Sequence, residues 1–94
     1  MPWGFIQELP VSAEEYDRID QAIQGDPEGL IIHTASEKSG RIRVIDIWES
    51  KDAYKRFESE QLMPAVQSLG SQAPTEPPSM DEFEVHNIRG RGRQ

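Results

Sequence analysis

Bulky side chains alternate with small or polar ones over residues 3–9, as they do on a pleated strand. Two further runs rich in β-branched residues, 30–35 and 42–49, flank the segment Glu37–Gly40. Gly40 offers the positive φ that a tight turn needs, so the two runs are predicted to form a hairpin. A last alternating stretch, residues 81–88, completes four predicted strands.

Between the first two strands the pattern changes to helical spacing. Ser12 and Glu15 form a capping box, in which the hydroxyl accepts from the amide three residues on and the carboxylate returns to the Ser12 amide. Apolar residues then recur with a helical period as far as Ile23. A short amphipathic helix is therefore predicted to begin after Ser12 and to stop at Gly25 and Pro27.

A second helix is predicted after the hairpin, with Ser50 as its N-cap. The apolar face marked by Phe57 continues one residue out of register further along, and Pro64 cannot donate to the preceding turn. We therefore expect a kink or two successive short helices near residues 58–63. Residues 70–79, with three prolines and no large apolar side chain, are expected to form an extended connection.

The predicted elements follow the order β-α-β-β-α-β. A four-stranded antiparallel sheet with both helices on one face, the ferredoxin-like α+β fold, satisfies this order. A chain of 94 residues is enough for one domain, so we assign residues 1–88 to a single domain. Residues 89–94, rich in Arg and Gly, are expected to form a flexible tail.

Both faces of the predicted hairpin are rich in apolar side chains, which a sheet covered on one face only would not need. The simplest cover for the second face is the same face of a second copy, so we expect a homodimeric α+β barrel closed around a shared interior. One face is expected to carry Leu30, Ile32, Ile45 and Ile47, and the other Ile31, Ile42, Val44 and Trp48.

Composition and charge exclude several classes of protein. The chain has no cysteine, which excludes disulfides and thiolate zinc sites. Seventeen acidic residues against ten basic ones give a net charge of −7, which opposes binding to nucleic acid or to an anionic membrane. No apolar run is long enough to span a membrane and no signal-peptide pattern is present, so a cytoplasmic location is expected.

The hairpin brings together the residues with the clearest catalytic chemistry. With a loop centred on Lys38-Ser39, His33 pairs with Val44, and His33 and Asp46 become diagonal neighbours on one face, roughly 5–8 Å apart between Cβ atoms. A buried aspartate raises the pKa of the adjacent imidazole and fixes its tautomer, as a general base requires. We therefore name His33 as a candidate base and Asp46 as its orienting partner. A purely structural polar link between the two strands remains the alternative.

Four aromatic residues are candidates for the wall of a substrate pocket, although residues of this kind also serve as ordinary core. The second histidine, His86, is a further substrate-binding candidate. If Phe83 and Val85 face the helices, His86 shares the other face with Glu84, towards the partner subunit or a barrel mouth. The four aromatic candidates are Trp48, Tyr16, Tyr54 and Phe57.

No metal or other cofactor is expected from the residue pattern. A metal site built from His33 and His86 would need further ligands, and no spacing typical of metal-binding histidines occurs. Haem is disfavoured because an acidic surface offers little to hold its propionates. Glycine-rich nucleotide motifs and nucleophile elbows are also absent from the sequence.

Several short segments within residues 3–88, taken together, resemble one protein family. The most characteristic is the Trp48-Glu49-Ser50 junction into the second helix, and the others are Gly29–His33, Val44–Ile47, Phe57, Leu62–Ala65 and Phe83–Asn87. In these segments the chain resembles the small dimeric α+β barrel proteins related to antibiotic biosynthesis monooxygenases. The resemblance implies a homodimer of ferredoxin-like subunits, often with a pocket between sheet and helices. Characterised members include cofactor-independent oxygenases of aromatic polyketides, polyketide cyclases and haem-degrading enzymes.

These observations lead to one functional hypothesis and one alternative. The hypothesis is an antibiotic biosynthesis monooxygenase-like enzyme that carries out cofactor-independent oxidation or proton transfer on a small aromatic or polyketide-like metabolite. The alternative is a non-catalytic dimer that binds a ligand or a partner protein. A cavity of roughly 300 Å³ or more reaching His33 would favour an enzyme or ligand binder, and a filled space would favour a scaffold.

Overall fold

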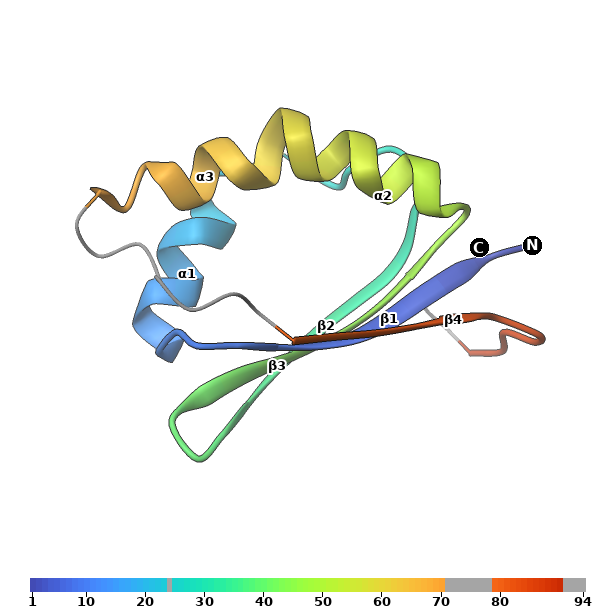
Figure 1. Ribbon diagram of the computed structural model, residues 1–94, viewed down its shortest axis with the longest axis horizontal. Helices are drawn as coiled ribbons and strands as arrows, with labels where there is room; N and C mark the ends of the chain where they lie inside the picture. The colour runs from blue at the N-terminus through green and yellow to red at the C-terminus, as the bar shows by residue number, and fades with distance from the viewer. Residues whose placement is uncertain (24, 71–78, 91–94) are drawn as a thin grey trace.

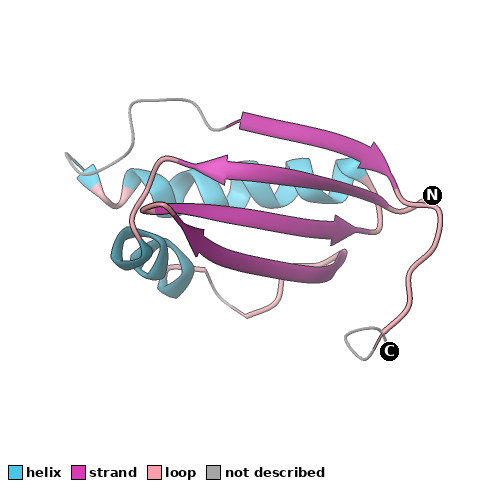
Figure 2. Ribbon diagram, turned by 90° about the horizontal axis from the view of Figure 1, so that it is seen from below, coloured by secondary structure: helices cyan, strands magenta, loops and turns pink. Residues whose placement is uncertain are grey.

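The computed structural model describes residues 1–23, 25–70 and 79–90. Four strands form one antiparallel sheet in the order β2-β3-β1-β4, and the helices cover one face of it (Figures 1 and 2). This is the ferredoxin-like fold predicted from the order of elements. The elements are β1 (Trp3–Leu9), α1 (Ala13–Gln21), β2 (Leu30–Lys38), β3 (Arg41–Trp48), α2 (Lys51–Phe57), the π-helical η1 (Glu58–Leu62), α3 (Met63–Gln67) and β4 (Ser79–Glu84).

Most of the predicted connection at 70–79 and of the predicted tail at 89–94 lies outside the described residues. No helix within the described part of the chain is long and apolar enough to cross a bilayer.

The helices begin where the sequence predicts, but α1 ends at Gln21, before the predicted stop at Gly25 and Pro27. Both halves of the capping box between Ser12 and Glu15 are formed, and the Ser50 hydroxyl accepts from the Ala53 amide at the start of α2. The predicted irregularity near residues 58–63 is the π-helical turn η1, which leads into α3 with Pro64 in its first turn. Side-chain caps thus fix where α1 and α2 begin.

The core is an aromatic cluster between the sheet and α2. Tyr54 of α2 is 1% exposed and lies against Trp3, Phe5 and Trp48, with ring centroids 5.4, 4.8 and 5.5 Å away. Pairs of this kind contribute about 0.5–1.5 kcal/mol each beyond the burial of their area. The cluster therefore fixes α2 against β1 and β3.

The hairpin register differs from the predicted one by two residues. The turn is Ser39-Gly40, with φ of 55° and 77°, and Lys38 pairs with Arg41. Positive φ at both central residues is the geometry of the turn that best fits the twist of a hairpin. His33 consequently lies directly opposite Asp46, not opposite Val44 as predicted. A shift of two residues leaves each side chain on its predicted face, because the pleat has a period of two.

A β-bulge at the start of β2 changes the predicted faces. Leu30 pairs with Trp48 and Ile32 pairs with Ile47, so Ile31 is the extra residue between them. Leu30 therefore packs against the core and does not share a face with Ile32, and the predicted grouping of Ile31 with the core residues of β3 is also wrong. Ile32, Ile45 and Ile47 remain together on the outer face, as predicted.

The last strand is earlier and oriented differently than predicted. It ends at Glu84, and Phe83 pairs with Gly4 on the outer face, away from the helices. A Cβ atom at Gly4 would lie 2.9 Å from the Phe83 ring, so this aromatic side chain occupies the space that the glycine leaves. Glu82 instead faces the helices, where it accepts hydrogen bonds from the Trp3 indole and from Lys51. The predicted placement of His86 required Phe83 to face the helices, and Phe83 does not.

Candidate active site

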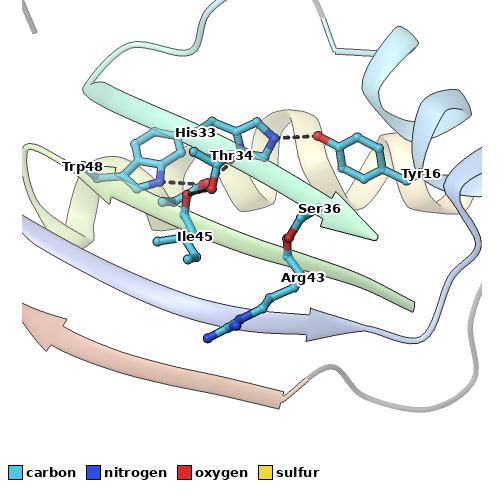
Figure 3. Close-up of polar contacts among 8 residues, drawn as sticks. Tyr16, His33, Thr34, Ser36, Arg43, Ile45 and Trp48 are labelled. Carbon is cyan, nitrogen blue, oxygen red and sulfur yellow. Dashed lines mark hydrogen bonds and ion pairs between the residues drawn. The ribbon is translucent and has the colours of Figure 1, made fainter. Parts of the chain in front are cut away.

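A continuous chain of hydrogen bonds crosses the covered face of the sheet. The indole Nε1 of Trp48 donates to Oδ2 of Asp46 over 3.1 Å, and Oδ1 of Asp46 lies 2.6 Å from Nδ1 of His33. The other imidazole nitrogen, Nε2, lies 2.5 Å from the hydroxyl oxygen of Tyr16 on α1 (Figure 3). Three elements, β3, β2 and α1, thus contribute to one polar network.

Local structure accounts for each position in this network. The Ser39-Gly40 turn sets the register that puts His33 opposite Asp46. The capping box fixes the start of α1, which presents Tyr16 to β2. The rings of Tyr16 and His33 stack with an interplanar angle of 11°.

The outer face has its own contacts. Thr34 and Ser36, which follow His33 on β2, donate their hydroxyls to the carbonyl oxygens of Ile45 and Arg43. Figure 3 shows Ile45 and Arg43 projecting from β3 away from the network.

Burial increases along the network from His33 through Asp46 to Trp48, and Tyr16 is half-buried. The Asp46 side chain is 6% exposed, and that of His33 is 34% exposed. A buried carboxylate is tolerated only when its oxygens are bonded, and here each oxygen has a partner. The network therefore has a buried end at Trp48 and an accessible end near His33 and Tyr16.

Electrostatics favour a protonated imidazole and a protonated phenol. The hydrogen bond to Asp46 raises the pKa of His33, and partial burial opposes this effect. Burial raises the pKa of Tyr16 to about 12, helped by the carboxylates of Asp20, Asp46 and Asp17. His33 is thus a strengthened proton acceptor, and Tyr16 does not ionise by itself near neutral pH.

The carboxylate also determines the tautomer of His33. An ionised Asp46 can only accept, so Nδ1 carries the proton that it receives. In the neutral imidazole Nε2 is then an acceptor, and the Tyr16 hydroxyl donates to it. In the imidazolium Nε2 donates to Tyr16, whose own proton is released for another partner. The two protonation states of His33 therefore reverse the direction of the last hydrogen bond.

The structure brings four of the predicted site residues together: Tyr16, His33, Asp46 and Trp48. The sequence predicts Tyr16 only as an aromatic wall and misses its hydrogen bond to His33. Its position in the helix following the first strand, on the face that packs on the sheet, was the available signal.

Tyr54 and Phe57 lie in the aromatic core and not in the hydrogen-bonded network. Phe57 packs on Trp48, with ring centroids 5.2 Å apart. The Tyr54 hydroxyl is buried and makes no hydrogen bond to the described residues. Burial raises the pKa of Tyr54, and the nearby carboxylates of Glu58 and Asp46 raise it further. These two residues support the network through their packing on Trp48.

His86 is exposed, follows the end of β4 and lies apart from the His33 network. It lines a hollow of about 480 Å³ together with Met1, Pro2, Ile31 and Glu49, among others. A second hollow, of about 410 Å³, lies at the hairpin end of the outer sheet face, where Arg41, Arg43 and Glu8 contribute. Neither hollow is lined by His33 or Asp46.

No group of three or more His, Cys, Asp or Glu side chains in residues 1–23, 25–70 and 79–90 is arranged to hold a metal ion.

The fold and the network define a ferredoxin-like α+β protein with a His–Asp pair on the covered face of its sheet. A protein of unknown function from Nitrosomonas europaea has the same fold, with a TM-score of 0.74, 13% identity, and 96% of this chain and 94% of that chain covered. A candidate antibiotic biosynthesis monooxygenase from Caulobacter crescentus gives a TM-score of 0.68 at 13% identity, with 92% and 91% covered.

A monooxygenase of Streptomyces coelicolor, solved in complex with the ligand nanaomycin D, is a third structural neighbour. Its TM-score is 0.62 at 17% identity, with 95% of this chain and 91% of that chain covered. These neighbours confirm, at the level of the fold, the resemblance noted in the sequence. No protein-family profile matches the chain, and no curated protein sequence matches it.

Proposed function

We propose that this protein is a small-molecule enzyme of the antibiotic biosynthesis monooxygenase-like type, which transfers a proton to or from an aromatic or polyketide-like substrate without a cofactor. The observation that carries the proposal is the hydrogen-bonded network from Trp48 through Asp46 and His33 to Tyr16. The likeness in fold to a monooxygenase solved with nanaomycin D supports an aromatic substrate class.

In this mechanism His33 is the proton acceptor and Asp46 stabilises the imidazolium that forms. Removing a proton from an activated C–H group leaves an electron-rich carbanion on the substrate. Such a carbanion reacts with molecular oxygen directly, so the protein needs to supply a base, orientation and exclusion of water. For a ring methylene the products are a carbonyl group and water, with one oxygen atom in each.

The proposed assembly is a homodimer in which the outer sheet face packs on the same face of a second copy. Ile32 and Ile45 of this face are 39% and 37% exposed, which is high for branched apolar side chains. Ile6 pairs with Ile45, and Ile47 pairs with Ile32, so the four isoleucines occupy two adjacent rows of the sheet. Their grouping supports an apolar contact surface.

The second candidate function is a non-catalytic dimer that binds a partner protein. One observation favours it: both hollows lie away from His33, as expected if the His–Asp pair is a structural link. In that case the pair contributes only to the stability of the hairpin.

Anthrone, a planar tricyclic ketone with an acidic methylene, is a suitable probe for the enzymatic proposal. Oxygen consumption and anthraquinone formation above the uncatalysed rate are expected with the wild type, and His33→Gln should reduce them by about 100-fold or more. Asp46→Asn removes the carboxylate beside His33. Its control is Asp26→Asn, which removes a carboxylate from an exposed loop. A wild type without activity on anthrone or on any copurifying small molecule identified by mass spectrometry would favour the non-catalytic dimer.

A further inference from the structure

Both ring nitrogens of His33 are already engaged. Nδ1 is bonded to Asp46, and Nε2 lies 2.5 Å from the Tyr16 hydroxyl. A substrate could reach Nε2 directly only by displacing Tyr16, because a neutral imidazole has a single acceptor nitrogen. The residue predicted to be the base is thus separated from any substrate by a second proton-carrying group.

The network opens to solvent at the Tyr16–His33 bond. Its Trp48–Asp46 bond is buried, its His33–Asp46 bond is partly buried, and its Tyr16–His33 bond is exposed. A ligand approaching from solvent therefore meets the network at this bond, where the acceptor nitrogen of a neutral His33 is already occupied by the Tyr16 hydroxyl.

We infer that Tyr16 is the catalytic residue that exchanges the proton with the substrate, and that His33 acts as a positioned proton store behind it. The inference rests on the proposed function and deepens it, since it names the group that touches the substrate. Trp48 and Asp46 are then positioning residues, which hold the imidazole through the carboxylate.

The step is a concerted transfer of two protons. The substrate C–H bond breaks and leaves its electron pair on carbon, while its proton moves to Oη of Tyr16. The original hydroxyl proton of Tyr16 moves to Nε2 of His33. The products are a substrate carbanion, a neutral tyrosine and an imidazolium paired with Asp46, so one proton has left the substrate and one has been stored.

The charges around Tyr16 explain why the two transfers must be coupled. Burial of Tyr16 disfavours a phenolate, and the carboxylates of Asp20, Asp46 and Asp17 add to this effect. The same carboxylates Asp20 and Asp46 favour an imidazolium at His33. A free tyrosinate is therefore not the base, and the negative charge never needs to rest on Tyr16.

The test separates proton transfer from oxidation. Without oxygen, exchange of the anthrone methylene protons for deuterium is followed by NMR in wild type, Tyr16→Phe, His33→Gln and the Asp26→Asn control. We expect Tyr16→Phe to slow the catalysed exchange by about 100-fold, close to His33→Gln, with the control unchanged. Tyr16→Phe frees Nε2, so exchange retained or increased in this variant would overturn the inference and leave the proposed function intact. A wild type that catalyses neither exchange nor oxidation would overturn both.

A second substitution preserves the ring contacts if Tyr16→Phe fails to fold. Replacing Tyr16 by 3-fluorotyrosine keeps the hydroxyl and makes it more acidic. A relay through the phenol predicts a changed exchange rate at a given pH, whereas the pH profile stays set by His33. An unchanged rate would mean that Tyr16 only covers His33 and passes no proton.

Discussion

Asp46 is a buried carboxylate with a different donor on each oxygen, an indole on one side and an imidazole on the other. Removing a charge from water is costly, and the two hydrogen bonds offset that cost only while both donors remain aligned. The acid therefore couples the chemistry of His33 to the packing of Trp48. A change at Asp46 should affect both stability and protonation.

Asp46→Asn is expected to destabilise the fold by about 1–3 kcal/mol. The amide is uncharged, and with its oxygen towards Trp48 its NH₂ group faces Nδ1, so His33 must take the other tautomer and loses its charge-assisted bond to a carboxylate. Chemical denaturation measures the loss, with Asp26→Asn as the control for charge. A stability equal to that of the control would mean that water or another donor replaces the network.

The pH dependence follows from the raised pKa of His33. A group that binds its proton more tightly when folded stabilises the fold fully below its unfolded pKa of about 6.5, and this stabilisation is lost as pH rises through the folded pKa. We expect the free energy of unfolding of wild type to fall across this window relative to His33→Gln. Proton acceptance needs neutral His33, so the exchange rate should rise across the same window. Parallel curves for the two proteins would argue against the His33–Asp46 contact.

At the scale of elements, the sequence predicts faces better than registers. Alternation around Gly40 correctly puts His33 and Asp46 on one face, yet the pairing is displaced by two residues. Alternation specifies a register only to within two residues, and the choice of turn residues settles the rest. Here Ser39 adopts a positive φ, a conformation that a serine does not predict.

The last strand shows what alternation lacks. Phe83 reads as a core residue, but an edge strand beside Gly4 has room for an aromatic ring on the outer face. Only the pairing of β4 with β1 reveals that vacancy. The role of Tyr16 is hidden for a similar reason, because it depends on how α1 packs on β2.

Gly29, at the entry to β2, is constrained by both conformation and contact. Its φ is +89°, and a Cβ atom there would lie 2.6 Å from Cβ of Ala53 on α2. Gly29→Ala should therefore destabilise the fold by more than about 1 kcal/mol. Gly25→Ala is the matched control, because Gly25 has φ of +63° with nothing within 4 Å. Equal losses of unfolding free energy in the two variants would show that the contact with Ala53 contributes nothing.

At the scale of the whole molecule, the outer sheet face changes from apolar to charged towards the hairpin end. Ile32, Ile47, Ile45 and Ile6 occupy adjacent rows, and the hairpin end is charged. The sequence predicts this second apolar face correctly for Ile32, Ile45 and Ile47. The bulge removes Leu30 from it, which alternation alone could not reveal.

Ile45→Lys is expected to dissociate the proposed dimer, because the substitution puts a charge at the centre of the apolar rows. Light scattering should give a dimer for wild type and a monomer for the variant. Gln67→Lys, an exposed position on the helix side, adds the same charge elsewhere and should remain dimeric. A monomeric wild type would refute the assembly.

The two hydrogen bonds of His33 depend on different parts of the fold. His33 and Asp46 are joined through one tight hairpin, whereas Tyr16 reaches His33 only when α1 is seated on the sheet. Local openings of a native protein release its least anchored units first. A transient departure of α1 would therefore uncover Nε2 and leave the imidazole still oriented by its carboxylate. Motion of this single helix would thus act as a gate between a closed relay and an exposed base, on a timescale that amide hydrogen exchange in α1 would report.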